Sequence, residues 1–191
     1  MAKEGQAVAL DNEQHNEFLA YLSNTRHYIR DTLIYLLTCR AGLRIGSVAK
    51  LKLSDVVDSS GQPKQVITLS KNITKGGKTI TAFINHVEVQ EALINWLRIR
   101  GNKRLDTLFI TQKNTSFSPN SMGQIMLKHY NNAGYEGSSS HSGRAFFASQ
   151  CLKNGMDIVA LSKVMGHSSI TTTSRYVRHN QEELMQLVAN N

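Results

Sequence analysis

Apolar residues recur at three- and four-residue intervals through the first part of the chain, which is the period of an amphipathic helix. The pattern follows a polar start at residues 11–13 and stops at Gly42. The positions concerned are Phe18, Leu19, Leu22, Ile29, Leu33, Leu36 and Leu37. They predict two amphipathic helices before Gly42.

Two β-branched runs further along the chain predict a β-hairpin. They cover residues 66–69 and 79–84, and between them lies the sequence Thr-Lys-Gly-Gly-Lys at residues 74–78. Glycine tolerates the positive φ of a tight turn, and the two lysines make this turn basic. We therefore expect a small antiparallel sheet with a basic tip.

Helix-start signals indicate further helices after the hairpin. Asn85 and Glu88 have capping-box spacing ahead of an apolar stretch, which predicts a helix that runs to about Arg100. The pair Ser118-Pro119 is typical of a second helix start.

Three or four short helices are expected after the serine-rich loop at residues 138–140, the last of them starting at Asn180 with Glu183 as its capping partner. The chain has two prolines, no internal repeat and no low-complexity segment, so nothing marks a domain boundary. The predicted fold class is mainly α with one small antiparallel β-sheet, in a single domain.

Composition narrows the class of protein. A share of 40% hydrophobic residues in 191 excludes an intrinsically disordered chain. Lys and Arg number 22 against 14 Asp and Glu, and the formal charge of +8 favours a polyanionic partner such as nucleic acid.

The longest strongly apolar run, residues 32–39, is too short to span a membrane, and the N-terminus lacks a signal-peptide pattern. We expect a cytoplasmic protein without a membrane partner.

Several apparent motifs for metal or nucleotide binding are incomplete. Cys39 and Cys151 lack the spacing of a zinc site or a disulfide framework. The sequence Gly-Lys-Thr at residues 77–79 lacks the glycine of a phosphate-binding loop, because Asn72 stands five positions before Gly77. His167 and His179 are too far apart for one helical face of a zinc protease. We expect neither a metal nor a cofactor.

A spaced set of basic residues that ends in a tyrosine remains. Its members are Arg44 in Ala-Gly-Leu-Arg, Lys75 in the hairpin turn, His141 and Arg144 as His-x-x-Arg, His167 in Met-Gly-His, and Tyr176. Each of them alone has an ordinary structural interpretation, but the complete set in this order resembles the catalytic domain of the tyrosine recombinases, the phage integrase family.

The C-terminal part of the resemblance is the most specific. Residues 165–176, Met-Gly-His-Ser-Ser-Ile-Thr-Thr-Thr-Ser-Arg-Tyr, are similar to the family box Leu-Gly-His-x-x-x-x-x-Thr-x-x-Tyr and keep its nine-residue step from His to Tyr. Asp55 falls where the family commonly carries an acidic residue, which the resemblance implies orients Arg44. The match covers nearly the whole chain and implies a tyrosine recombinase catalytic-domain fold.

The chain also departs from the family pattern. Ser47 stands where a glutamate is usual, and Gly143 and Ala145 replace the usual leucine and His or Arg. Family members usually carry an additional N-terminal helical domain that closes around DNA. We expect residues 1–191 to be a single catalytic domain without that core-binding domain, either a fragment or a short member similar to the fimbrial phase-switch invertases.

The residue types suit phosphoryl transfer by their own chemistry. A phosphodiester gains negative charge toward its pentavalent transition state, and planar guanidiniums bind two phosphate oxygens at once, a role that suits Arg44 and Arg144. A tyrosine phenol has a pKa of about 10, so Tyr176 needs nearby cations to become a nucleophile. The resulting phosphotyrosine is readily reversed, so no ATP or metal is required.

The resemblance implies the remaining roles. Tyr176 attacks the scissile phosphate to give a 3′-phosphotyrosyl link, which a free 5′-hydroxyl later reverses. Lys75 protonates the departing 5′-oxygen, although Lys71 and Lys78 are equally placed by spacing alone. His141 hydrogen-bonds the phosphate or assists proton transfer at Tyr176, and His167 supports the nucleophile.

The implied function is site-specific DNA recombination or integration. The implied partners are double-stranded DNA, other protomers assembled on it and accessory DNA-bending proteins, and the implied location is the nucleoid. Two alternatives remain open. One is a DNA-binding regulatory module of the same fold with weak or no catalysis, and the other is a type IB topoisomerase relative that relaxes supercoils without exchanging strands between partners.

Overall fold

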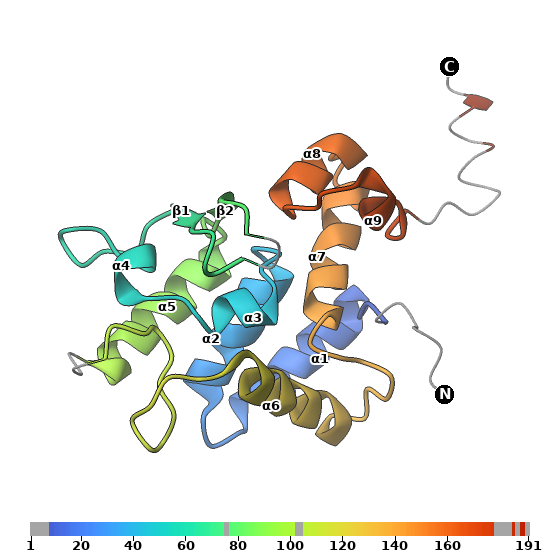
Figure 1. Ribbon diagram of the computed structural model, residues 1–191. Coiled ribbons are helices and arrows are strands. Elements are labelled where there is room, and N and C mark those ends of the chain that lie inside the picture. Colours follow the sequence, from blue (N-terminus) through green and yellow to red (C-terminus); the bar gives the residue numbers. More distant parts are fainter. Residues whose placement is uncertain (1–7, 75–76, 102–104, 178–184, 186–187, 190–191) are drawn as a thin grey trace.

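Helices dominate the fold (Figure 1). The structure is a computed structural model that describes residues 8–74, 77–101, 105–177, 185 and 188–189. Its elements in chain order are α1 (Asn12–Ser23), α2 (Tyr28–Cys39), α3 (Ile45–Val48), α4 (Leu53–Val56), β1 (Val66–Leu69), β2 (Ile80–Phe83), α5 (Val87–Arg100), α6 (Pro119–Asn132), α7 (Ser142–Lys153), α8 (Ile158–Val164) and α9 (Ile170–Ser174). The predicted class, mainly α with one small antiparallel sheet, is confirmed.

The helix α2 lies at the centre of the molecule. Every residue from Leu33 to Cys39 is buried, and α1, α5 and α7 all pack against this helix. A helix that is apolar on all sides needs neighbours on all sides, because each face exposed to water would forfeit hydrophobic stabilisation. The apolar pattern of residues 29–37 thus determines which helix forms the core.

The helix α7 approaches α2 closely through a glycine. A Cβ added at Gly143 would lie 2.1 Å from Oγ1 of Thr38, a distance that no side chain can tolerate. Gly143 therefore lets the first turn of α7 rest on α2, which positions the neighbouring Arg144.

The two strands form an antiparallel pair in which Val66 is opposite Phe83 and Leu69 is opposite Ile80. Burial alternates along both strands, so one face of the hairpin covers the core and the other faces solvent. In Figure 1 the hairpin and α3 stand on one side and α7, α8 and α9 on the other.

Several helix starts agree with the sequence and one differs. Asp11 and Gln14 form the capping box of α1, and Ser118 caps α6 with Pro119 in its first turn. The N-cap of α5 is His86, whose Nδ1 accepts the backbone N–H of Glu88, so the prediction of Asn85 as the cap was wrong. The helix predicted from Asn180, with Glu183 as its capping partner, lies outside the described residues.

Candidate active site

Arg44 is positioned by the sharp turn between α2 and α3. Gly42 has a φ of +63°, a left-handed conformation that favours glycine, and a Cβ there would lie 2.6 Å from the ring of Phe147 in α7. Arg44 is the N-cap of α3, and its side chain is half-buried. The glycine of Ala-Gly-Leu-Arg therefore allows the turn that presents the Arg44 guanidinium beside α7.

Arg144 lies in the first turn of α7 and is nearly buried, with 5% of the residue exposed. Its Nη1 donates to the carbonyl of Gly42, and its Nη2 donates to the carbonyl of Met165. These two bonds hold the guanidinium rigidly between the turn that carries Arg44 and the segment that carries His167.

His167 is held by hydrogen bonds at both ring nitrogens. Its Nε2 lies 3.0 Å from Nη2 of Arg144, and its Nδ1 lies 2.7 Å from Oγ1 of Thr173. Because arginine can only donate, Nε2 must accept, and the ring proton must be on Nδ1 and point to Thr173. Thr173 is fully buried. Burial, together with the charges of Arg144 and Arg44, lowers the pKa of His167 to about 4, so the ring is neutral at pH 7.

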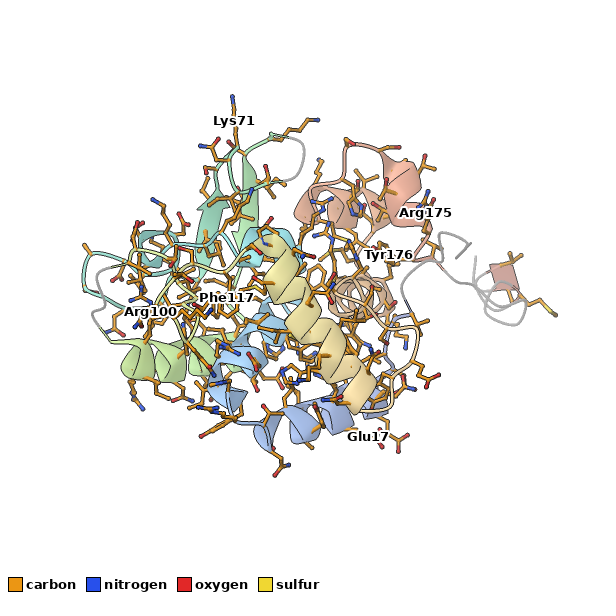
Figure 2. All side chains as sticks on the ribbon, turned by 60° about the horizontal axis from the view of Figure 1, so that its bottom comes forward. Glu17, Lys71, Arg100, Phe117, Arg175 and Tyr176 are labelled. Carbon is orange, nitrogen blue, oxygen red and sulfur yellow. The ribbon has the colours of Figure 1, made fainter. Side chains whose placement is uncertain are left out.

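Tyr176 follows α9 in a turn, and its backbone N–H donates to the carbonyl of Thr173 at 3.0 Å. Its ring is stacked with the ring of His167, with centroids 6.3 Å apart and planes 15° apart. The side chain packs on the small apolar cluster of Ala148, Leu161 and Met165 and is labelled in Figure 2. The nine-residue step from His167 to Tyr176 therefore brings the two rings together.

The two guanidiniums give the site a positive charge that favours the binding of an anion. Burial is the largest cause that lowers the pKa of Arg144, to about 9, and the charge of Arg44 lowers it further. Burial also lowers the pKa of Arg44. For both arginines the phenol of Tyr176 acts in the opposite direction, so all three groups lie within range of one another. Both arginines stay cationic at neutral pH, and a bound phosphate would relieve their mutual repulsion.

The structure brings together four of the predicted site residues, Arg44, Arg144, His167 and Tyr176. His141 is exposed and is the N-cap of α7, three residues before Arg144, so both lie on the same side of the first turn of this helix.

No contact within the described residues connects Asp55 to this group. Asp55 accepts the backbone N–H of Lys52 at 2.8 Å through its Oδ2 and so completes the first turn of α4. Its role in orienting Arg44 stays a prediction. Lys75 lies outside the described residues.

The other two lysines of the hairpin differ in position. Lys78 lines an open cavity of about 530 Å³ between β2 and α8, and His167 lines the same cavity. Lys71 points away from the helices at the end of the hairpin (Figure 2). Lys78 therefore shares a cavity with a member of the site.

Ser47 has a structural role of its own where the family pattern has a glutamate. It is buried, and its Oγ donates to the carbonyl of Ile73 at 3.1 Å. The next residue, Thr74, donates through its Oγ1 to the carbonyl of Lys78 at 2.5 Å. The first bond attaches the start of the hairpin turn to α3, the helix that Arg44 caps, and the second joins the two ends of the turn to each other.

Thr173 and Gly42 are parts of the site that the sequence pattern of titratable side chains did not predict. Thr173 fixes the tautomer of His167, and the carbonyl of Gly42 receives the Arg144 guanidinium. The signal for Thr173 was in the sequence, because the family box carries a threonine six positions after its histidine. The role of Gly42 is carried by its backbone and leaves no side-chain signal.

The arrangement places a phenol beside two cations, of which Arg144 is held by hydrogen bonds, and a neutral imidazole in one half-buried site. Such a group can bind a phosphodiester, stabilise the charge that develops on it and bring it to a nucleophile. Within the described part of the chain, no group of three or more His, Cys, Asp or Glu side chains could hold a metal ion. None of the described helices has the length and apolarity needed to cross a membrane.

Comparison with protein families gives one match over most of the chain, the model of the phage integrase family, at residues 9–183. Among curated proteins, the tyrosine recombinase XerA of Pyrococcus furiosus is 31% identical over 163 residues, which cover 84% of this chain and 54% of the relative. The tyrosine recombinase XerC of Caldanaerobacter subterraneus subsp. tengcongensis is 28% identical over 168 residues, 85% of this chain and 45% of the relative. The chain thus spans about half the length of these relatives.

Comparison with solved structures gives the same fold. A crystal structure of XerA recombinase has a TM-score of 0.77 at 24% identity and covers 97% of this chain and 66% of the other. The XerH site-specific recombinase bound to its difH substrate in a pre-cleavage complex has a TM-score of 0.74 at 21% identity, over 99% of this chain and 55% of the other. A lambda integrase dimer bound to a COC′ core site has a TM-score of 0.70 at 18% identity, over 92% of this chain and 49% of the other. The chain has the tyrosine recombinase catalytic-domain fold.

Proposed function

The chain belongs to the phage integrase family, and on that premise we propose that it is the catalytic domain of a site-specific DNA recombinase that cleaves and rejoins DNA strands. The observation that carries this proposal is the convergence of Arg44, Arg144, His167 and Tyr176 from α3, α7 and the segments around α9. Phosphate-binding cations beside a phenol are what a phosphotyrosyl transfer requires.

In the proposed reaction, the Oη of Tyr176 attacks the scissile phosphorus. A bond forms between phosphorus and the phenolic oxygen, the bond between phosphorus and the 5′-oxygen breaks, and the strand is left with a 3′-phosphotyrosyl link. A 5′-hydroxyl from another strand reverses the step. The phenolate is a better leaving group than an alkoxide, so rejoining needs no external energy source such as ATP.

Arg44 and Arg144 bind the non-bridging oxygens. Arg44 presents a planar pair of donors, and Arg144 is already fixed by two carbonyls and by His167, which leaves two of its five N–H groups for the phosphate. A donor that is held before the reaction loses little reorganisation energy during it, which is why such groups stabilise transition states strongly. His167 acts as the support that orients Arg144, because its accepting Nε2 faces the guanidinium.

The proton transfers are assigned to Lys75 and His141. Lys75 protonates the departing 5′-oxygen, and His141 hydrogen-bonds the phosphate or takes part in removal of the Tyr176 proton. The exposed position of His141 at the start of α7 supports a role that begins when substrate arrives. Asp55 belongs to the proposal as a residue that orients Arg44 indirectly.

The partners proposed for the whole protein are double-stranded DNA, other protomers assembled on it and accessory DNA-bending proteins, in the cytoplasm at the nucleoid. Residues 1–191 are proposed to form one catalytic domain. The excess of positive charge, +8, supports the DNA partner.

A nicked duplex tests the proposal directly. The nick lets the 5′-terminal fragment diffuse away after cleavage, so a covalent protein–DNA complex accumulates and survives denaturant. We expect this complex with the natural chain and none with Tyr176→Phe, which keeps the ring but lacks the nucleophile. Equal behaviour of the two would favour the DNA-binding regulatory module, and relaxation of plasmid without any recombination site would favour the topoisomerase alternative.

A further inference from the structure

A second cationic site lies at the other end of α2 from Arg44. It is an open cavity of about 510 Å³ between the α1–α2 connection, the loop before α6 and one face of α6. In Figure 1 the connection and the loop both lie at the bottom of the molecule. None of the residues of the candidate active site lines this cavity.

The cavity carries a surplus of positive charge. Four Lys or Arg side chains line it, Arg26, Arg30, Lys113 and Lys128, and its one carboxylate belongs to Asp31. Four cations against one anion leave an excess of three positive charges, before His27 and His129 are considered. Cavity walls of low dielectric constant focus the electric field, so these charges produce a higher positive potential than the same charges on a flat surface would.

Arg30 shows that the cavity is organised before any ligand arrives. Its side chain is only 9% exposed, its Nε donates to Oδ1 of Asp31 at 2.7 Å, and its guanidinium carbon lies 5.2 Å from the ring centroid of Phe117. Phe117 is labelled beside the start of α6 in Figure 2. Among the described residues the two terminal nitrogens of Arg30 have no hydrogen-bond partner, and since no buried side-chain nitrogen or oxygen lacks one, these nitrogens are accessible to solvent.

Asp31 offsets one of the four positive charges, and both of its oxygens are occupied by neighbouring donors. Oδ1 accepts from Arg30, and Oδ2 lies 3.0 Å from Nε2 of His129. Burial alone would raise the pKa of Asp31, but the hydrogen bonds from His129 and Arg30 outweigh it, and the pKa is lowered. The carboxylate thus holds Arg30 in place with its donors turned outward.

The remaining walls are also well ordered. The loop closes through the backbone N–H of Thr111, which donates to the carbonyl of Thr115 at 2.8 Å, and this turn carries Lys113. Gln112 contacts His27 at 2.6 Å and so ties the loop to the α1–α2 connection. Lys128 stands on α6 beside His129, on the face that lines the cavity.

We propose that this cavity binds a phosphate group, and that in the working complex the phosphate belongs to the DNA backbone away from the position of cleavage. A fixed guanidinium fork with lysines around it is a donor set that phosphate oxygens prefer. The nine residue-to-residue steps from Arg30 to Cys39 in α2 rise about 14 Å, or roughly four base pairs of duplex, so both ends of this helix can engage one DNA molecule. The DNA part of this proposal rests on the proposed function, and the phosphate part does not.

Two exposed lysines of the cavity allow a test that spares the fold. Lys113→Gln and Lys128→Gln each remove one charge, and Lys153→Gln removes the same charge at the exposed end of α7, away from the cavity. Arg30 is a poor choice for the first test, because its loss would leave Asp31 buried with one partner. Binding of the full chain to a 30-base-pair duplex is measured as a function of salt, and thermal unfolding is measured in inorganic phosphate, in adenosine monophosphate and in chloride at equal ionic strength.

We expect each cavity variant to make the slope of log K against log salt shallower by about one, relative to Lys153→Gln. We also expect each to lose part of the rise in Tm that phosphate produces. A loss of the phosphate effect with unchanged slopes on DNA would keep the phosphate site and overturn DNA as its source, in favour of a free phosphate or nucleotide. Slopes and Tm shifts equal to those of Lys153→Gln would overturn the proposal altogether. Neither measurement depends on strand cleavage, so the outcome is separate from the covalent trapping test.

Discussion

The hydrogen bond between Thr173 and His167 provides the sharpest test of how the active site is organised. Thr173→Val keeps the shape of the side chain but replaces its hydroxyl with a methyl group. The Nδ1–H of His167, which now lies 2.7 Å from Oγ1, would lose its acceptor in a site where Thr173 is fully buried. An unsatisfied donor of this kind costs about 1–3 kcal/mol.

The histidine has two ways to respond, and both disturb Arg144. It can keep its tautomer and shift toward another acceptor, or it can move the proton to Nε2, which would then face the donating Nη2 of Arg144 at 3.0 Å. If the full cost falls on the transition state, cleavage slows by about 5- to 150-fold, since each 1.4 kcal/mol is a factor of ten.

The assay is single-turnover cleavage of nicked duplex at saturating protein, with the dissociation constant measured separately. We expect a slower cleavage rate and little change in binding. Thr173→Ser retains the hydroxyl and should recover most of the rate. Thr172→Val, at the neighbouring exposed position, is the matched control and should resemble the natural chain.

A spectroscopic readout separates positioning from simple loss of structure. The ¹⁵N shifts of the His167 ring distinguish a protonated Nδ1 from a protonated Nε2, and we expect Nδ1–H in the natural chain and a changed or mixed state in Thr173→Val. The reasoning is refuted if Thr173→Val cleaves at the natural rate, or if the natural chain carries its proton on Nε2.

Three further predictions concern neighbouring groups. Arg144→Lys keeps the charge but not the planar fork, so the cleavage rate should fall by roughly 10² to 10³ while duplex binding changes far less; an equal fall in both would make Arg144 a general anchor. Lys75→Ala should be severely impaired on normal DNA and largely restored by sulfur at the bridging 5′ position, because a thiolate with a conjugate acid near pKa 8.5 leaves without a proton; rescue of Lys78→Ala in its place would move the general acid to Lys78. The free energy of unfolding should decrease as the pH falls from about 6.5 toward 4, because the unfolded chain takes up a proton at His167 in this range while the folded chain, with its pKa near 4, does not. Burial also lowers the pKa of His15 to about 4, so His15 contributes in the same direction. His167→Gln should therefore reduce that dependence without removing it in urea titrations at pH 7, 6 and 5, and an unchanged slope would contradict the assignment.

Much of the fold follows from local patterns in the sequence. The apolar period of residues 29–37 predicts α2, the β-branched runs predict the hairpin, and Ser118-Pro119 predicts the start of α6. These features depend on interactions within a few residues, namely side-chain period, capping and turn conformation, so the chain specifies them without tertiary contacts. The one misplaced helix start, Asn85 in place of His86, is of the same local kind and was off by one residue.

The sequence also determined that a histidine and a tyrosine belong to the site, because the spacing from His167 to Tyr176 places both on one short segment. It did not determine how those groups are held. The carbonyl that receives Arg144 belongs to Gly42, 102 residues earlier, and no side-chain pattern records a backbone acceptor. The Oδ2 of Asp55 accepts the backbone N–H of Lys52, and the orientation of Arg44 by Asp55 stays a prediction.

The cavity around Arg30 is a product of tertiary structure alone. Its cations come from the α1–α2 connection, α2, the loop before α6 and α6, and in the sequence they are separated by up to 102 positions and form no motif. Only the packing of α6 against its neighbours brings Lys128 toward Arg30, and only the Asp31 carboxylate turns the Arg30 donors outward. Local sequence specifies helices and turns because their interactions are short in range, whereas a site assembled from distant segments exists only after the core has formed.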